Sequence, residues 1–557
     1  MSESKTLDVV LCWHMHQPWY LVDDRFERPW VYLHALKDYA DMAAHLEAQP
    51  AARAVVNFVP VLLEQIERYT AAMSAWTRGA TPLPDPLLAA LAQPLPDTAA
   101  ERGRLVAACL DAAYPAALGR HRDYARLVDL ARAQRAPGLE RYLSDALLDD
   151  LVVWTHLVWL GEHDHRHEPS VQALVAKGGG FDRTDRRVLF DWIAARLEGL
   201  LSRYRALADA GRIELSVSPW AHPLVPLLLD LGVARQALPE IVLPDAGYPG
   251  GAERVRWHLS EALAAMERTF GRRPVGCWPP EAAISAQTLD VLGEFDFAWT
   301  ASSGAVLAAS LRAARAQIDC VHRPFRRGAG PRVFFRDDGL SDSIGFVYKD
   351  RDAAAAVAEL VGHLERIAAH CTRDDPVVTI ALDGENAWSH YPGNGYDFLS
   401  TLYRELTAHP RLRLTTFTEH LARGAPAAPL EQVIAGSWVY GTFSTWIGHP
   451  EKNRAWSLLV DAKRRVDALG ADSPAARRLL AICEGSDWYW WLGDDNSTES
   501  VATFDALFRA HLRALYRALG AAPPAVLESP LSRGSRTALA NTMRPTDASV
   551  PAAHDGS

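Results

Sequence analysis

The chain has 557 residues, of which 49% are hydrophobic and 23% are charged, and its formal net charge at pH 7 is -10. This composition is typical of a folded globular protein and excludes a disordered chain. No run of lysine and arginine with interleaved aromatic residues occurs, so we expect no nucleic-acid partner. The sequence lacks a signal-peptide pattern and an apolar run of the roughly 20 residues that a membrane span needs. We therefore expect a cytoplasmic protein without a membrane partner.

The six cysteines stand at positions 12, 109, 277, 320, 371 and 483, without CxxC pairing. Scattered cysteines are typical of reduced thiols in a cytosolic chain, so we expect neither disulfides nor structural zinc. The 18 tryptophans are well above common usage. An indole presents a flat apolar face and an N–H donor, which suits the wall of a ligand site as well as a core.

Short apolar runs rich in β-branched residues recur along the chain and predict strands. They lie at 7–13, 54–60, 213–218, 275–278, 297–301, 332–335 and 377–383. Stretches with helical periodicity separate them, for example at 189–211 and 353–370. Strands that alternate with helices favour a parallel sheet and, at this length, a barrel. We predict an α/β fold, a distorted (β/α)7 barrel with an inserted helical segment and a C-terminal helical bundle.

The same pattern divides the chain into regions. Residues 1–425 are predicted to form the barrel with a helical insertion at about 70–175, in which HDHRHEP and KGGGF are expected to be loops. Residues 426–525 are helical from about 452 onward and predict a helical domain that packs on the barrel and completes its site. Residues 526–557 lack apolar periodicity, which predicts a flexible tail.

Imidazole and indole side chains follow two of the predicted strands. The first strand is followed by His14, His16 and Gln17, and the third by Trp220 and His222. In parallel α/β folds ligands bind at the carboxyl ends of the strands. Alternation along an extended chain places His14 and His16 on the same side. This pair therefore binds a metal, lines a pocket for a polar substrate, or consists of hydrogen-bonded core histidines.

Carboxylates follow two other strands. Glu281 comes directly after two prolines that restrict its backbone, and Asp383 and Glu385 follow the strand at 377–382. Burial of a charged group beside an apolar strand costs free energy, so carboxylates at these positions indicate a functional role. Cleavage of a glycosidic bond requires two carboxyl groups, one as nucleophile or base and one as proton donor. The sequence therefore favours a glycosidase site at this end of the barrel.

Five segments resemble, in order and approximate spacing, the five sequence regions of glycoside hydrolase family 57. They are HMHQP at 14–18, IELSVSPWAHP at 213–223, CWPPE at 277–281, ALDGENAW at 381–388 and EGSDWYWW at 484–491. The likeness runs from about residue 7 to about residue 520 and is closest to the amylopullulanase and α-amylase branch.

This resemblance implies a retaining hydrolase of α-linked glucans, α-1,4 and also α-1,6, that forms a covalent glycosyl-enzyme intermediate. By motif, Glu281 matches the nucleophile and Asp383 the general acid/base. It implies an α-glucan as partner, no cofactor and no metal. We expect substrate-binding roles for His14, His16, Gln17, Trp220, His222, Trp278, Glu385, Trp388, Asp487 and Trp490. Further candidates for stacking on a sugar are Trp19, Trp438 and Trp446.

Three alternatives are open. The same scaffold could serve a 4-α-glucanotransferase or a glucan branching enzyme. A metal-dependent polysaccharide deacetylase or mannosidase would use His14, His16 and an aspartate as ligands. A non-catalytic glucan-binding protein would keep the barrel and the tryptophans without turnover. The tract HDHRH at 163–167 has the composition of a metal tract, but its polar surroundings favour a solvated loop.

Overall fold

The computed structural model describes residues 6–79, 82–135, 138–469, 473–538 and 542–546. Within these ranges, parallel strands close into a barrel in the order β10-β1-β4-β5-β6-β7-β9, and β9 pairs with β10 to complete the ring. These strands are β1 (Leu7–Met15), β4 (Ala54–Phe58), β5 (Ile213–Val217), β6 (Gly276–Cys277), β7 (Trp299–Ser303), β9 (Arg332–Arg336) and β10 (Val377–Asp383). Every predicted strand is present, so the prediction of a (β/α)7 barrel is confirmed.

The ring of strands is uneven, as a distorted barrel requires. β1 and β10 pair along their whole length, from Asp8 with Val377 to His14 with Asp383. β9 and β10 share only the pair Arg336 and Thr379. Short strands extend the sheet outside the ring: β8 (Phe325–Arg326) beside β9, β12 (Ala428–Pro429) beside β8, and β11 (Leu412–Leu414) beside β1.

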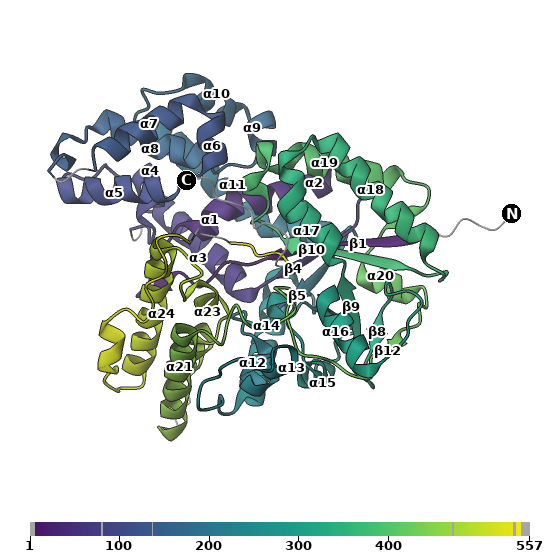
Figure 1. Ribbon diagram of the computed structural model, residues 1–557. Helices are drawn as coiled ribbons and strands as arrows, with labels where there is room; N and C mark the ends of the chain where they lie inside the picture. The colour runs from purple at the N-terminus through teal and green to yellow at the C-terminus, as the bar shows by residue number, and fades with distance from the viewer. Residues whose placement is uncertain (1–5, 80–81, 136–137, 470–472, 539–541, 547–557) are drawn as a thin grey trace.

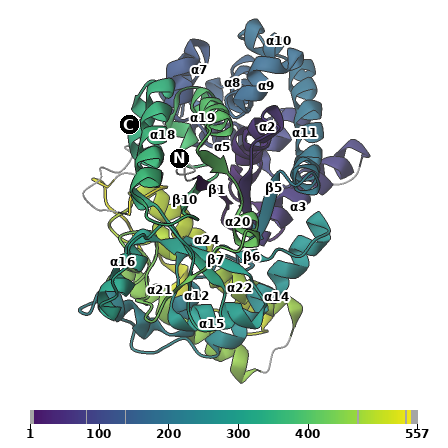
Figure 2. The ribbon, with the colours of Figure 1, turned by 90° about the vertical axis from the view of Figure 1, so that its right-hand side faces the viewer.

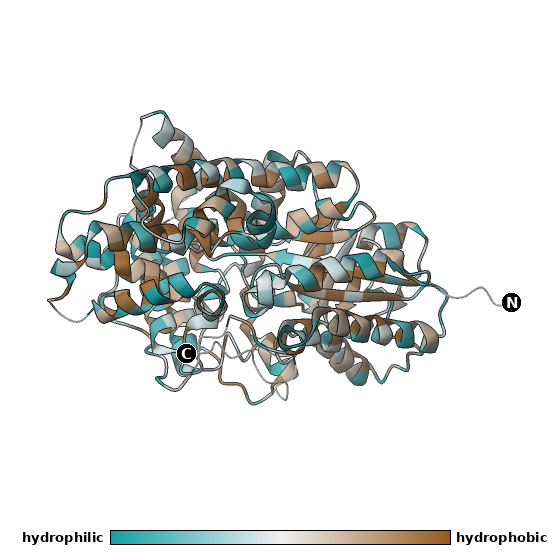
Figure 3. Cartoon of the chain, turned by 90° about the horizontal axis from the view of Figure 1, so that it is seen from above, coloured by the Kyte–Doolittle hydropathy of each residue, from teal (hydrophilic) through white to brown (hydrophobic). Residues whose placement is uncertain are grey.

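Helices surround the strands, as the view along β1 in Figure 2 shows. Hydrophilic and hydrophobic segments alternate along these helices (Figure 3), and every residue of β1, which they enclose, is buried. These helices are α1 (Trp30–His34), α2 (Ala40–Ala48), α3 (Pro60–Thr77), α11 (Arg183–Asp209), α12 (Val225–Leu229), α13 (Ala234–Ala237), α14 (Gly251–Phe270), α15 (Ala286–Glu294), α16 (Gly304–Ala314), α17 (Asp338–Asp342), α18 (Ala353–His370), α19 (Tyr396–Ala408) and α20 (Phe417–Ala422).

The predicted helical insertion forms a separate group at the upper left of Figure 1. It contains α4 (Pro86–Ala92), α5 (Ala99–Asp111), α6 (Pro115–Arg120), α7 (Arg122–Ala133), α8 (Asp145–Leu157), α9 (Glu162–His167) and α10 (Pro169–Lys177). The expected loop at HDHRH is wrong, because these residues belong to α9. Asp41 explains the helix: its carboxylate accepts hydrogen bonds from the backbone N–H groups of Glu162 at 2.6 Å and His163 at 3.1 Å.

The C-terminal helices pack at the carboxyl end of the barrel (Figure 1). They are α21 (Pro450–Ala468), α22 (Pro474–Cys483), α23 (Asp487–Trp491) and α24 (Thr498–Ala518). α24 contacts β2 (Leu21–Val22), which pairs with β3 (Arg25–Phe26) in a hairpin after β1. None of the helices in the described ranges is long and apolar enough to cross a bilayer.

Cys320 and Cys371 form a disulfide with their Cα atoms 5.7 Å apart, so the expectation of reduced thiols alone is wrong. The cause is the start of β10: the N–H of Val377 donates to the carbonyl of His322 at 3.0 Å, which brings the two flanking loops together. Spacing along the sequence cannot reveal this pairing, because the two cysteines are 51 residues apart. Free buried thiols are present at Cys12, Cys109, Cys277 and Cys483.

We predict that the double variant Cys320→Ser, Cys371→Ser lowers the free energy of unfolding by about 2–4 kcal/mol, because the bridge restricts the unfolded chain. Urea denaturation with and without dithiothreitol measures the loss. Dithiothreitol should destabilise the wild type to the level of the variant and leave the variant unchanged. A wild type that is insensitive to the reductant contradicts a stabilising bridge.

Candidate active site

The polar residues that follow the strands meet at one rim of the barrel. Because the barrel strands are parallel, their carboxyl ends open on one side, where α23 and α24 also lie (Figure 1). His14 of β1 stands in register with Asp383 of β10 and with Asn57 of β4. Residues in register on neighbouring strands point to the same face of a sheet, so these three side chains share one layer.

Glu281 lies in a left-handed backbone conformation after β6. Its φ is 58°, and that of Ala282 is 50°, a region that costs a residue with a Cβ atom roughly 1–2 kcal/mol. Hydrogen bonds hold this turn: the N–H of Trp438 donates to the carbonyl of Glu281 at 3.0 Å, and that of Ala282 donates to Pro279 at 2.9 Å. Strained backbone of this kind clusters at functional sites.

The carboxyl group of Glu281 is buried between two donors from outside the barrel strands. Nε1 of Trp438 donates to Oε2 at 3.0 Å, and the hydroxyl of Ser486 donates to Oε1 at 3.0 Å. Burial raises the pKa of Glu281 to about 8, and the nearby charges of Asp383 and Asp487 act in the same direction against the two hydrogen bonds. The influence of Asp383 shows that the two carboxyl groups share one environment.

Asp383 ends β10, and Nδ2 of Asn386 donates to its Oδ2 at 2.8 Å. Burial raises the pKa of Asp383 to about 6, while Asn386 and the nearby His16 act in the opposite direction. Because the pKa of Glu281 is about 8, the two groups together hold one proton between about pH 6 and pH 8. A site with one carboxylate and one carboxylic acid can perform nucleophilic and acid catalysis together.

Glu385 reaches the same rim because the chain turns closely past β1. A Cβ atom on Gly384 would lie 2.1 Å from Sδ of Met15, so the glycine allows this close packing against the methionine. Nε2 of Gln17 donates to Oε1 of Glu385 at 3.2 Å. Oε2 of Glu385 and Nδ1 of His16 are buried without a hydrogen-bond partner among the described residues. These two atoms can bind hydroxyl groups of a ligand.

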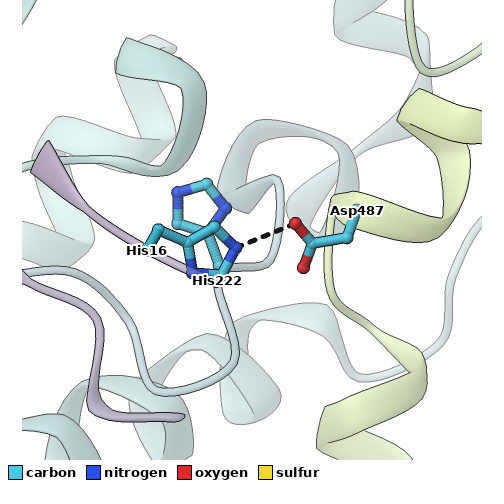
Figure 4. Close-up of side chains that lie close together, drawn as sticks. All are labelled: His16, His222 and Asp487. Carbon is cyan, nitrogen blue, oxygen red and sulfur yellow. Dashed lines mark hydrogen bonds and ion pairs between the residues drawn. The ribbon is translucent and has the colours of Figure 1, made fainter. Parts of the chain in front are cut away.

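His16, His222 and Asp487 come from three separate segments and lie together in Figure 4. Nε2 of His16 lies 2.8 Å from Oδ1 of Asp487. The two imidazoles stack, with centroids 4.0 Å apart and planes inclined by 24°. The lone pair of a ring nitrogen lies in the ring plane, so stacked rings direct their lone pairs side by side and not toward a common point. The geometry therefore favours hydrogen bonding over metal chelation.

A buried ionic network fixes the segment that carries Ser486 and Asp487. Nε and Nη2 of Arg254 donate to Glu484 at 2.8 and 2.9 Å, and Nε2 of His258 lies 2.7 Å from the same carboxylate. Burial alone would raise the pKa of Glu484, but Arg254 and His258 lower it to about 2. Because Arg254 and His258 belong to α14, this network ties residues 484–487 to the barrel.

The family model for glycosyl hydrolase family 57 matches residues 10–430 of the chain. This range contains the strand ends that carry His14, Glu281 and Asp383. The chain belongs to glycosyl hydrolase family 57. As a member of this family it is an enzyme of the glycoside hydrolase class. A search of curated proteins finds no match.

Several solved structures are similar to this chain in fold. The branching enzyme of Pyrococcus horikoshii is 14% identical with a TM-score of 0.55, over 92% of this chain and 88% of that chain. The α-amylase of Thermotoga maritima is 12% identical with a TM-score of 0.52, over 93% and 97%. The 4-α-glucanotransferase of Thermococcus litoralis is 14% identical with a TM-score of 0.51, over 91% and 60%. At these identities the similarity concerns the fold alone.

The predicted tryptophans of this family 57 enzyme are buried around the rim. Trp220, Trp278 and Trp388 are 1%, 0% and 1% exposed, and Trp490 is 9% exposed. Nε1 of Trp388 donates to the carbonyl of Gly384 at 3.1 Å, so this indole supports the loop after β10. Contact of these four residues with a sugar stays a prediction.

The sequence reasoning did not single out two polar residues of the family 57 site. One is Ser486, which contacts Glu281 and lies inside the EGSDWYWW segment. The other is Asn57, whose Oδ1 lies 2.7 Å from Nδ1 of His14. The available signal for Asn57 was a single amide within the apolar strand run AVVNFVP.

The described end of the chain also reaches the rim, where the sequence predicts a flexible tail. The guanidinium of Arg544 lies 5.2 Å from the ring centroid of Trp490. The N–H of Thr546 donates to Asp342 at 2.8 Å, and its hydroxyl accepts from Arg336 at 2.7 Å. Residues 542–546 therefore bridge the C-terminal helices to β9 and α17, while residues 547–557 of the predicted tail lie outside the described residues.

We predict that Glu484→Gln destabilises this family 57 enzyme by roughly 3–5 kcal/mol, because it leaves the buried guanidinium of Arg254 without a counter-charge. Urea denaturation at pH 7 measures the change. Glu294→Gln is the matched control, because Glu294 pairs with Arg256, an exposed arginine of α14, the helix that also carries Arg254. This variant should lose less than about 1 kcal/mol of stability. Equal losses in the two variants contradict the anchoring role of Glu484.

Proposed function

We propose that the protein is a retaining hydrolase of α-linked glucans, of the amylase or amylopullulanase type, in which Glu281 is the nucleophile and Asp383 the general acid/base. The observation that carries the proposal is the pair of buried carboxyl groups that holds one proton between about pH 6 and pH 8. The names of the structural relatives, a branching enzyme, an α-amylase and a 4-α-glucanotransferase, support α-glucan as the substrate class.

The reacting form has the shared proton on Asp383, whereas the higher pKa of Glu281 places it on Glu281 in most free molecules near pH 7. In the first step of that form the carboxylate of Glu281 attacks the anomeric carbon, and Asp383 donates its proton to the glycosidic oxygen as that bond breaks. In the second step Asp383 accepts a proton from water, which displaces Glu281 and restores the free enzyme. The two donors to Glu281, Trp438 and Ser486, aim the carboxylate and stabilise its charge.

Sugar hydroxyl groups bind to His16, Glu385 and Asp487 in this proposal. Nδ1 of His16 and Oε2 of Glu385 are the buried atoms that lack partners among the described residues. Gln17 orients Glu385, and the contact with His16 orients Asp487. A hydroxyl group both donates and accepts, so a sugar satisfies imidazole nitrogen and carboxylate oxygen alike.

Product analysis tests the proposal. Chromatography after incubation with maltoheptaose, amylose and pullulan should show shorter reducing oligosaccharides, and products from pullulan report the α-1,6 activity. Longer oligosaccharides without new reducing ends identify a glucanotransferase, and new α-1,6 branches in amylose identify a branching enzyme. Binding of amylose without any product overturns the enzyme assignment.

Glu281→Gln and Asp383→Asn should each lower kcat by about three orders of magnitude or more, because each removes a reacting group at almost constant volume. Initial rates on maltoheptaose measure the loss, and circular dichroism confirms the fold. Asp85→Asn, a buried carboxyl group that caps α4 in the insertion, is the control and should keep most of the activity. A Glu281 or Asp383 variant that keeps more than about a tenth of the wild-type rate contradicts its assigned role.

A further inference from the structure

Glu281 ends a buried chain of hydrogen bonds that crosses the rim. Its Oε1 lies 3.0 Å from Oγ of Ser486, which lies 2.9 Å from Nδ1 of His222. Nε2 of His222 lies 3.1 Å from Nε2 of His14, and Nδ1 of His14 lies 2.7 Å from Oδ1 of Asn57. All five side chains are buried. We call Asn57, His14, His222 and Ser486 the relay.

The hydrogens of the relay allow only two directions. The hydroxyl of Ser486 has one hydrogen. Burial lowers the pKa of His14 to about 3 and that of His222 well below its ordinary range. Each imidazole is therefore neutral near pH 7, with one N–H donor and one acceptor nitrogen. The ionisation of Glu281 at one end, or the orientation of the Asn57 amide at the other, therefore sets the direction of every hydrogen bond in the relay.

An ionised Glu281 requires one of these directions. The hydroxyl of Ser486 then donates to the carboxylate and accepts from Nδ1 of His222. The acceptor Nε2 of His222 takes a hydrogen bond from Nε2 of His14, whose Nδ1 must accept from the amide nitrogen of Asn57. In the other direction a protonated Glu281 donates to Ser486, and His14 donates to the amide oxygen. The two directions differ by the one proton on Glu281, which passes to water, while each imidazole moves its single hydrogen to its other nitrogen.

The surroundings of Asn57 accept both directions. Rotation of the amide by 180° exchanges its oxygen and nitrogen at almost constant shape. With the nitrogen toward His14, the amide also donates to Oγ of Ser218 at 3.0 Å, whose own hydrogen goes to the carbonyl of Trp278 at 2.8 Å. The hydroxyl of Ser216, at 3.2 Å, then donates to the amide oxygen. In both orientations the amide keeps a hydrogen bond to His14 and one to Ser216.

We propose that the relay stabilises the ionised form of Glu281, and so raises the fraction of molecules in which the shared proton of the carboxyl pair lies on Asp383, because in one of its two directions it donates a hydrogen bond to the carboxylate of Glu281. This inference rests on the proposed function of Glu281 as nucleophile. The four residues of the relay act through Glu281 and are positioning residues. The carboxyl group of Glu281 also faces Asp383 from β10, Asp487 from α23 and, at 3.9 Å, Nδ1 of His222. The negative charges of the two aspartates favour a protonated Glu281. The hydroxyl of Ser486 opposes them, because its hydrogen bond favours the ionised form.

Ser486→Ala tests the relay through the pH profile of kcat/KM on maltoheptaose, which reports the free enzyme. Glu281 has the higher pKa of the pair and therefore governs the alkaline limb, near pH 8. Loss of the donor raises that pKa further, so the alkaline limb should move up by about one unit. The maximum should fall about tenfold, because fewer molecules have the proton on Asp383. The acid limb should not move.

Ser486→Thr keeps the hydroxyl and should restore both the maximum and the limb. Ser302→Ala is the matched control: this buried serine donates to the carbonyl of Ala282, beside Glu281 but outside the relay. It should leave the limb where it is. Asn57→Leu, which removes the amide at similar volume, should move the limb in the same direction as Ser486→Ala.

Three results overturn the relay: an unmoved alkaline limb in Ser486→Ala, an equal shift in Ser302→Ala, or no restoration by threonine. If Ser486→Ala does not fold, the limb of Asn57→Leu decides the question alone. Failure of the proposed function has a different signature, because it appears as activity retained in Glu281→Gln. A dead Glu281→Gln with an unmoved limb in Ser486→Ala refutes the relay alone.

Discussion

The contact between Glu281 and Ser486 is the interaction on which the site depends, because it joins the barrel to a segment outside it. The barrel supplies Glu281 and Asp383, and residues 484–487 supply the hydroxyl and the carboxylate that face them. The network around Glu484 fixes this segment at a buried point, where Arg254 and His258 of α14 contact its carboxylate. A barrel without these C-terminal residues keeps Trp438 and Asn386 as donors to the two carboxyl groups but lacks the hydroxyl of Ser486.

Burial is the second constraint, and it acts on both carboxyl groups. It raises the pKa of each, and the charge of Asp383 raises the pKa of Glu281 further, so the pair holds one proton between about pH 6 and pH 8. The remaining question for such a site is which of the two groups holds the proton. Burial and nearby charges favour the proton on Glu281, and hydrogen-bond donors shift this balance: Trp438 and Ser486 favour the charge on Glu281, whereas Asn386 favours it on Asp383. Two neutral imidazoles behind Ser486 make its hydrogen bond dependent on a residue as distant as Asn57.

Much of this arrangement could be predicted from the sequence, because apolar strand runs and the residues that end them are local features. The strands predicted at 7–13, 275–278 and 377–383 followed directly from the apolar runs, and the polar residues after the last two placed Glu281 and Asp383 at one rim. Long-range contacts could not be predicted in this way. The bridge between Cys320 and Cys371 depends on how β10 begins, and α9 depends on a carboxylate of α2.

The relay and the C-terminal residues 544–546 also depend on long-range contacts that the sequence pattern does not reveal. Asn57 is a single amide in an apolar strand, and its purpose becomes visible only when the register of β1 and β4 places it beside His14. Arg544 and Thr546 lie in a stretch without periodicity, yet their partners Trp490 and Arg336 belong to elements far away in the chain. Hydropathy patterns describe burial along one element, whereas these contacts are set by the closure of the barrel.

Trapping of the covalent intermediate tests the central claim most directly. α-Maltosyl fluoride needs no acid to leave, so the Asp383→Asn variant should form the glycosyl-enzyme and hydrolyse it slowly. Peptide mass spectrometry after rapid quenching should then find a maltosyl group on Glu281, together with a burst of fluoride. A burst of fluoride with the sugar on another residue, such as Glu385, or with no labelled peptide at all, would contradict Glu281 as the nucleophile.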